Sequence, residues 1–168
     1  MFLQPDIVLN RITDITVQML KSKNIGALII DVDNTLSTHK GQNFVDGIQN
    51  WISTMRQNNI KLIILSNAKT KRLNVFANRI GIEGMGMAAK PLPFGYIKAA
   101  KKMKSKLKNT AIVGDQLFTD VLGGKLAGVK TILVTPILLE DGFSFKVRRK
   151  LENKIKRKFK ITEEKYVG

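Results

Sequence analysis

Two aspartates separated by one residue directly follow an apolar stretch early in the chain. Asp31 and Asp33 come after the apolar residues 25–30, and Asn34 and Thr35 follow them. One carboxylate can attack phosphorus to form an aspartyl-phosphate, and the other can protonate the leaving oxygen and later activate water. The same pair could instead cap a helix or form an Asx turn, in which case the acids would only accept backbone hydrogen bonds.

Three further polar signals occur later in the chain, in the order that phosphoryl transfer would need. Ser66-Asn67 ends a second apolar stretch, where a hydroxyl and backbone N–H groups could hold phosphoryl oxygens. Lys90 could offset the charge of a nucleophile and a phosphate. Asp115 and Asp120 follow another apolar stretch and could lie near Mg²⁺, which prefers oxygen ligands. Each signal alone is weak, but the set in this order indicates a phosphoryl-transfer site.

Alternating apolar and amphipathic segments must position these residues. We expect strands over residues 25–31, 61–66, 84–88, 110–114 and 131–134, and helices over 45–57, 68–80, 94–107 and 116–126. Short apolar strands with helices between them predict a Rossmann-like three-layer α/β domain with a five-stranded, mostly parallel sheet. Ligands bind beyond the carboxyl ends of such strands, which is where the polar signals fall. Phe94, at the start of one helix, is expected to pack in the core.

The motifs resemble those of the haloacid dehalogenase superfamily of phosphatases, over residues 27–135. The resemblance rests on Asp31-Val32-Asp33-Asn34-Thr35, Ser66, Lys90 and Gly114-Asp115 with Asp120. It implies that Asp31 is the nucleophile and Asp33 the general acid and base. It further implies that Ser66 binds the phosphoryl group and that Lys90 orients it.

The resemblance also implies a Mg²⁺ site and several supporting roles. The ion would be held by the Asp31 side chain, the Asp33 backbone carbonyl and Asp115, with Asp120 as a supporting acid near the metal or Lys90. We assign Asn34 and Asn67 to substrate binding. His39, the only histidine, lies in a loop after the nucleophile and could touch substrate or face solvent.

The intervals between motifs leave no room for an inserted cap domain. Only 29 residues separate Leu36 from Ser66, and 23 separate Ser66 from Lys90. This is similar to the capless subfamily IIIA and predicts an open active site. Such a site suits a large or surface-bound phosphate, or closure by a neighbouring subunit.

The full pattern is similar to the YqeG-type group, which is itself similar to phosphatidylglycerophosphate phosphatases. The residues that carry this finer resemblance are Gln4-Pro5-Asp6, residues 31–36 and Ala89-Lys90-Pro91. It implies an anionic lipid phosphate, phosphatidylglycerophosphate, as substrate. One alternative is a soluble sugar, nucleotide or small organic phosphate. The alternative of another class is a basic RNA- or ribosome-binding module on a phosphatase fold.

The composition restricts the number of domains, the kind of partner and the chemistry that this chain can have. The 168 residues suit one domain, and 29 lysines and arginines against 13 acids give a net charge of +16, which indicates a polyanionic partner. The absence of cysteine excludes disulfides, thiolate zinc sites and cysteine nucleophiles. No secretory signal or membrane-spanning stretch is visible, so we expect a cytoplasmic protein, with peripheral contact at the inner membrane surface left open.

The C-terminal segment is the most basic part of the chain. We expect a phosphatase domain over 1–141 and a basic amphipathic appendage over 142–168. Residues 145–160 carry nine basic side chains and one acid. An apolar stripe runs along the same segment: Phe143, Val147, Leu151, Ile155 and Phe159. The stripe could pack on the domain, lie on an anionic membrane, or leave the basic face to contact RNA.

Overall fold

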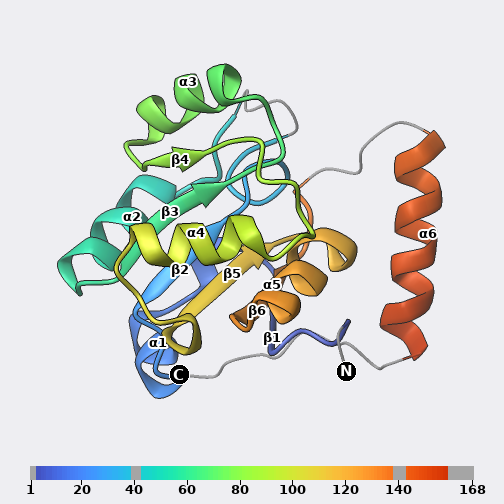
Figure 1. Cartoon of the computed structure of the whole chain (residues 1–168), viewed down its shortest axis with the longest axis horizontal. Coiled ribbons are helices and arrows are strands. Elements are labelled where there is room, and N and C mark those ends of the chain that lie inside the picture. Colours follow the sequence, from blue (N-terminus) through green and yellow to red (C-terminus); the bar gives the residue numbers. More distant parts are fainter. Residues whose placement is uncertain (1–2, 39–42, 138–142, 159–168) are drawn as a thin grey trace.

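The computed structural model describes residues 3–38, 43–137 and 143–158 of the chain. A six-stranded sheet, with every pair of strands parallel, runs through its centre (Figure 1). The strand order is β1-β6-β5-β2-β3-β4. The strands are β1 (Ile7–Leu9), β2 (Ala27–Ile30), β3 (Lys61–Leu65), β4 (Gly84–Met85), β5 (Thr110–Gly114) and β6 (Lys130–Val134).

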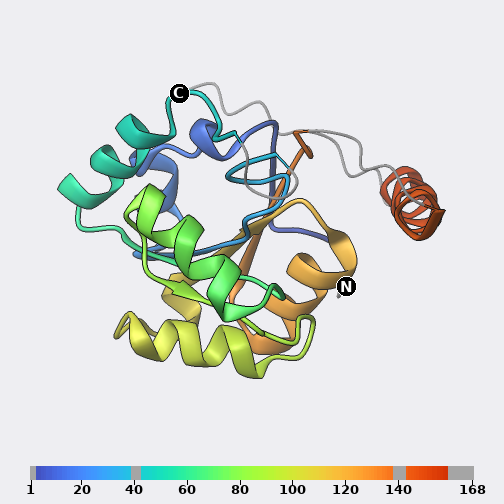
Figure 2. The same cartoon turned by 90° about the horizontal axis from the view of Figure 1, so that it is seen from above.

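Helices connect these strands and cover both faces of the sheet (Figure 2). The α-helices are α1 (Val17–Ser22), α2 (Ile48–Gln57), α3 (Thr70–Ile80), α4 (Phe94–Lys102), α5 (Leu122–Ala127) and α6 (Phe143–Lys158). Short helical turns occur at η1 (Ile12–Asp14), η3 (Leu107–Asn109) and η4 (Leu117–Val121). The predicted α/β fold class is therefore confirmed.

The prediction of five strands was wrong by one, because β1 adds a sixth strand at the edge. Ile7 pairs with Ile132 and Leu9 with Val134, both in parallel register. Three residues are too few to show a strand pattern in the sequence. Asp6 secures the start of the strand, since its Oδ2 accepts hydrogen bonds from the backbone N–H and the hydroxyl of Thr131 at 2.8 and 2.9 Å.

Alternate residues of the central strand enter two separate cores. Leu28 and Ile30 belong to the core that α1, α2 and α3 cover, whereas Ala27 and Ile29 belong to the core beneath α4 and α5. A strand that is buried on both faces needs apolar residues at every position, which explains the unbroken apolar run before Asp31. This burial fixes the end of β2, and with it the position of Asp31.

Phe94 does not pack in the core, contrary to expectation. It is 73% exposed at the start of α4. The buried side of that helix is formed by Tyr96, Ala99 and Ala100. Position 94 lies two residues before Tyr96, and a 3.6-residue repeat therefore turns it away from the sheet.

The described residues between the motifs contain no cap domain. Between Leu36 and Ser66 they form α2 and β3, and between Ser66 and Lys90 they form α3 and β4. The carboxyl edge of the sheet therefore carries no inserted domain in the described part of the chain. Over all the residues that the structure describes, no helix is long and apolar enough to cross a membrane.

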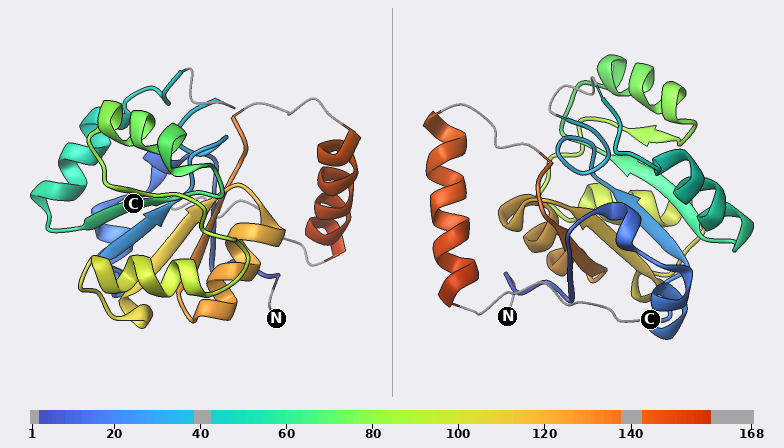
Figure 3. Two further views of the ribbon diagram at one scale, coloured as in Figure 1. Left: turned by 45° about the horizontal axis from the view of Figure 1, so that its top comes forward. Right: turned by 180° about the vertical axis from the view of Figure 1, so that it is seen from behind.

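Helix α6 lies outside the three layers (Figure 3). A hydrogen bond joins it to the domain at η4. Glu152 is fully buried, and its Oε1 accepts a hydrogen bond from the Leu117 backbone N–H at 3.1 Å. Ile155 packs against the small core around Leu117, whereas Leu151 is half exposed. Part of the predicted stripe therefore packs on the domain. Phe159 lies outside the described residues, as do the side chains of Phe143 and Val147.

The Glu152 contact predicts how firmly α6 is attached. Glu152→Ala should leave the buried Leu117 N–H without its acceptor and lower the free energy of unfolding by about 1–3 kcal/mol. Cleavage by trypsin within the lysine-rich α6 should become faster, because the helix is held less tightly. The measurement is thermal unfolding together with limited proteolysis, and Asn153→Ala, at the exposed neighbouring position, is the control. Equal behaviour of the two variants would contradict the contact.

Candidate active site

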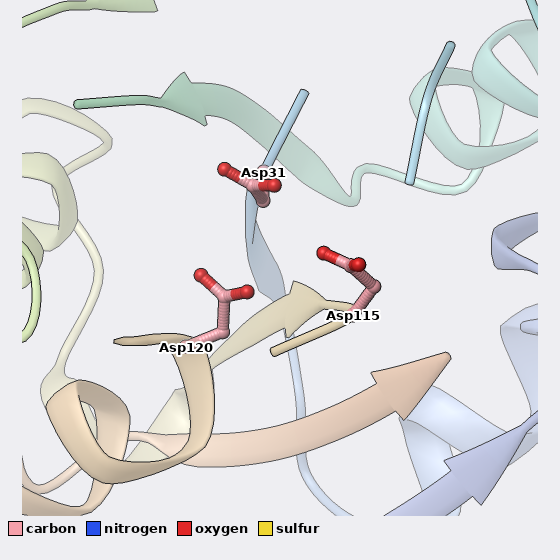
Figure 4. A group of neighbouring side chains, drawn as sticks. All are labelled: Asp31, Asp115 and Asp120. Carbon is pink, nitrogen blue, oxygen red and sulfur yellow. The ribbon is translucent and has the colours of Figure 1, made fainter. Parts of the chain in front are cut away.

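Three aspartates meet at the carboxyl edge of the sheet. Asp31 follows β2, Asp115 follows β5 and Asp120 belongs to η4, and Figure 4 shows their side chains directed toward one another. All three are buried, and one carboxylate oxygen from each lies within 4.8 Å of the others. Because β2 and β5 are parallel neighbours in the sheet, residues 84 positions apart in the chain end at the same place.

Lys90 neutralises part of this negative charge. Its Nζ donates to Asp31 Oδ1 at 2.6 Å and to Asp120 Oδ1 at 2.7 Å, and all three side chains are almost completely buried. The side chain of Asn67 holds the Lys90 backbone from both sides. Asn67 Oδ1 accepts from the Lys90 N–H at 2.7 Å, and its Nδ2 donates to the Lys90 carbonyl at 3.2 Å. The ammonium is thus positioned by the segment after Ser66 as well as by its own loop.

The carboxylate of Asp120 is held in place by the backbone of Gln116 and lies close to the backbone of Gly114. Its Oδ2 accepts a hydrogen bond from the Gln116 N–H at 3.2 Å, while Oδ1 takes the Lys90 ammonium. A Cβ atom at Gly114 would lie 2.2 Å from the Asp120 carboxyl carbon, so only glycine fits there. The residues of η4 form one π-helical turn, and such turns occur frequently at functional sites.

Tyr96 supports the same turn from α4. Its buried hydroxyl donates to the Thr119 carbonyl at 2.8 Å, immediately before Asp120. A Cβ atom at Gly123 would lie 2.3 Å from that hydroxyl, so glycine is needed there as well. Burial raises the pKa of the Tyr96 hydroxyl, and the nearby Asp120 charge raises it further. The tyrosine therefore stays protonated and acts as a hydrogen-bond donor.

The electrostatics of Asp31 and Lys90 follow from their burial together. Burial raises the pKa of Asp31, the Lys90 charge opposes this, and the charges of Asp120 and Asp115 raise the pKa further, so that its net value is about 8. Burial alone would lower the pKa of Lys90, but the charges of Asp120 and Asp31 outweigh it and raise that pKa. Lys90 is therefore protonated, whereas Asp31 is ionised mainly above about pH 8 when no further cation is present.

Asp33 lies next to this group but outside it. Its carboxylate is partly exposed and forms an ion pair with Arg72 of α3, at 3.2 Å between Nη2 and Oδ1. Ser66 is buried, and its Oγ accepts a hydrogen bond from the Ala68 N–H at 3.1 Å. Asp33 and Ser66 line one pocket together with Arg72. The predicted proton donor and the predicted phosphate-binding hydroxyl are therefore adjacent at this edge.

The remaining predicted residues are placed as follows. Asn34 is fully buried with a positive φ of 62° in the loop after Asp33, where its N–H donates to the Ser37 carbonyl at 2.8 Å. The side chain of Asn67 contacts the Lys90 backbone, as described above. His39 lies outside the described residues. The roles of Asn34 and Asn67 in substrate binding stay predictions.

Arg72 and Tyr96 contribute to the site, and sequence reasoning missed them. Arg72 stands in the first turn of the helix after Ser66, close to the edge where ligands bind, and that place was the available signal. Tyr96 belongs to the core side of α4, and no pattern distinguishes it from a packing aromatic.

The acidic group fits a divalent cation. Three carboxylates gathered around one space are hard oxygen donors of the kind that Mg²⁺ and Ca²⁺ prefer. Both oxygens of Asp120 already accept hydrogen bonds, one of them from Lys90. Asp31 and Asp115 are therefore the better candidates for direct ligands, and Asp120 is better suited to anchor the lysine.

Removing the lysine predicts a measurable loss of stability. Lys90→Met should leave Asp31 and Asp120 buried without their cation and lower the free energy of unfolding by about 3–5 kcal/mol. Adding Asp120→Asn to that variant should restore part of the loss, because one of the two buried charges is then gone. Urea unfolding of the native chain, Lys90→Met, Asp120→Asn and the double variant gives the coupling between the two side chains. It is measured in EDTA above about pH 8, where Asp31 is ionised. Strictly additive losses would contradict the ion pair.

Comparisons with known proteins agree with this geometry. The family model described as haloacid dehalogenase-like hydrolase matches residues 41–128, which include Ser66, Lys90, Asp115 and Asp120. The chain is 36% identical over 154 residues to "Probable phosphatase YqeG" of Bacillus subtilis strain 168, which covers 92% of this chain and 90% of that protein.

Solved structures share the fold at low identity. The cobalt-bound deoxy-D-mannose-octulosonate 8-phosphate phosphatase of Haemophilus influenzae has a TM-score of 0.54 at 18% identity, over 82% of this chain and 90% of that one. A hydrolase from Streptococcus pneumoniae has a TM-score of 0.57 at 12% identity, over 77% of this chain and 99% of that one. A haloacid dehalogenase family hydrolase from Deinococcus radiodurans, with bound phosphate and sodium, has a TM-score of 0.52 at 14% identity. The match covers 82% of this chain and 96% of that one.

These findings confirm the predicted superfamily and the prediction of a phosphatase. The family model alone spans more than half of the chain, and the curated relative spans nearly all of it. The chain belongs to the haloacid dehalogenase-like hydrolases, and its enzyme class is that of a phosphatase.

Proposed function

We propose that this phosphatase hydrolyses phosphomonoesters in a magnesium-dependent reaction in which Asp31 carries the phosphoryl group. The observation that supports this most is the buried contact of Asp31 with Lys90, at the carboxyl edge of the sheet and beside Asp115. A carboxylate held there by a permanent cation is oriented for attack on phosphorus. A merely structural aspartate would not need two further buried acids around the same space.

Each side chain has one task in the proposed reaction. A carboxylate oxygen of Asp31 attacks phosphorus, and the ester oxygen leaves with a proton from Asp33. Asp33 then takes a proton from a water molecule that attacks the aspartyl-phosphate, which releases phosphate and restores Asp31. Ser66 holds a phosphoryl oxygen, and Lys90 keeps Asp31 in place throughout.

The proposed cation is Mg²⁺. It would be held by the Asp31 carboxylate, the Asp33 backbone carbonyl and Asp115, and when bound it neutralises the phosphate charge and holds the phosphate in line. Two of the structures that share the fold are described with a cation, cobalt in one and sodium in the other. The acidic group of this chain has the oxygen donors that such a site requires.

We further propose an anionic lipid phosphate, phosphatidylglycerophosphate, as the substrate. The carboxyl edge has no cap in the described residues, so a headgroup held in a membrane could reach it. Large apolar side chains flank Lys90 in the chain and are exposed: Met87 at 72%, Leu92 at 52% and Phe94 at 73%. With a net charge of +16, such residues suit the surface of an anionic leaflet.

The first experiment measures phosphate release from phosphatidylglycerophosphate in mixed micelles with Mg²⁺. We expect release by the native chain, and a loss of at least about a thousandfold with Asp31→Asn, because the nucleophile is gone. Asp46→Asn, which removes an exposed acid outside the proposed machinery, is the matched control. Release from p-nitrophenyl phosphate alone, still dependent on Asp31, would reject the lipid and favour a soluble phosphate. If neither substrate releases phosphate and the protein binds RNA in a salt-sensitive way, the RNA- or ribosome-binding module would be favoured.

The pKa of Asp31 predicts how cation binding depends on pH. Asp31 has a pKa of about 8 in the folded chain and 3.8 ordinarily, so without a cation the fold loses stability as pH rises from about 4 to 8. A cation needs the ionised carboxylate, so its apparent affinity should rise up to tenfold per pH unit in this range and level off above about 8. The shift in melting temperature caused by Mg²⁺ at pH 6, 7 and 8 measures this. A shift independent of pH, or an equal slope in Asp31→Asn, would contradict it.

A further inference from the structure

A small pocket lies beside the proposed proton donor and is separate from the acidic group. It has a volume of about 240 Å³, and its lining includes Asp33, Ser66, Arg72 and Arg79. The two arginines come from α3, the helix that follows Ser66. In the proposed reaction, the group attached to the phosphate through its ester oxygen leaves past Asp33, and this pocket is adjacent to that side chain.

The walls of the pocket differ in character. Leu73 and Phe76, which are buried in the core, give it an apolar floor. Arg72 and Arg79 are exposed and stand one above the other on α3, seven residues apart. The guanidinium of Arg79 lies 4.9 Å from the ring centre of Phe44, which fixes its direction. The pocket therefore presents two cations and the carboxylate of Asp33 over an apolar floor, with positive charge in excess.

Arg72 has donors to spare in this arrangement. Within the described part of the chain, it forms an ion pair from Nη2 to one oxygen of Asp33, and half of the side chain is exposed. A guanidinium carries five N–H donors in a planar fork that matches carboxylate and phosphate oxygens. Arg72 can thus contact Asp33 and an anion of the substrate from adjacent edges.

We propose that this pocket, which we call the second-anion pocket, binds a second anionic group of the substrate. The group is a phosphodiester or a carboxylate, joined to the scissile phosphate by a short uncharged spacer that lies on the apolar floor. This inference rests on the proposed function, because it assigns the leaving group of that reaction to the side of Asp33. Arg72 is the main contact, and Arg79 adds charge at the rim.

The size of the pocket restricts what enters it. Ligand pockets for drug-sized molecules occupy about 300–1,000 Å³, so a pocket of about 240 Å³ holds a headgroup and no acyl chain. The same chemistry occurs in the headgroup of an anionic lipid and in a free bis-anionic phosphate. Both sources offer the pocket the same two charges and the same spacer.

The test compares the hydrolysis of substrates that carry one or two anionic groups by variants at positions 71 and 72. The substrates are phosphatidylglycerophosphate in mixed micelles, its deacylated headgroup in solution, and p-nitrophenyl phosphate. The variants are Arg72→Ala, Arg72→Lys and Lys71→Ala. Lys71→Ala is the matched control, because it removes the same charge from the same turn of α3 at an exposed position outside the pocket.

We expect Arg72→Ala to lower kcat/KM for both bis-anionic substrates by about tenfold to a hundredfold, mainly through KM. Its effect on p-nitrophenyl phosphate should be much smaller, and Arg72→Lys should restore part of the loss. Equal losses on all three substrates would overturn the proposal and assign Arg72 only to positioning Asp33. No loss beyond that of Lys71→Ala would overturn it too.

Failure of the pocket and failure of the proposed function give different results. If native protein hydrolyses p-nitrophenyl phosphate through Asp31, the reaction stands, whatever the Arg72 variants do. If Arg72→Ala harms the lipid and its deacylated headgroup alike, the headgroup is what the pocket recognises. Loss on the lipid alone would contradict recognition of a second anion and indicate a contact with the micelle surface.

Discussion

The site depends on one buried lysine that is shared by two aspartates. Without Lys90, the close approach of Asp31, Asp115 and Asp120 would place three carboxylates in a space that excludes water. Several features of the fold serve to hold that cation: the Asn67 side chain on its backbone, and glycine at position 114, which lets Asp120 approach. The cluster costs stability as a set of charges, and it holds a carboxylate at the edge where ligands bind in folds of this kind.

Much of this could be predicted because a doubly covered parallel sheet leaves a clear pattern. The residues before Asp31 are apolar at every position, since alternate side chains of β2 enter opposite cores. The carboxyl ends of the strands then identify one edge, and Asp31, Ser66, Lys90 and Asp115 are found there or beside it. Four separate residues in the right order carried more information than any one of them, because each type of residue is common on its own.

What sequence reasoning missed has equally physical causes. Strand β1 has three residues, and its place depends on the pairing of Asp6 with Thr131, across 125 residues of chain. Phe94 was expected in the core because it is large and apolar, but the helical repeat turns it outward. The partnership of Arg72 with Asp33 is a contact between two segments that no local pattern relates. Helix α6 is held through a buried acid, Glu152, although its sequence is dominated by basic residues.

If the phosphoryl group passes through Asp31, it can be trapped there as an aspartyl-phosphate. p-Nitrophenyl phosphate labelled in its phosphoryl group would be mixed with the Asp33→Asn variant, in which hydrolysis of the aspartyl-phosphate is slowed. The reaction would then be quenched in acid, and the peptides would be mapped for the label. We expect an acid-stable, hydroxylamine-sensitive phosphoryl group on the peptide that contains Asp31, formed as fast as nitrophenol is released. Release of nitrophenol together with free phosphate, with no label on that peptide at any time, would show that Asp31 does not carry the phosphoryl group.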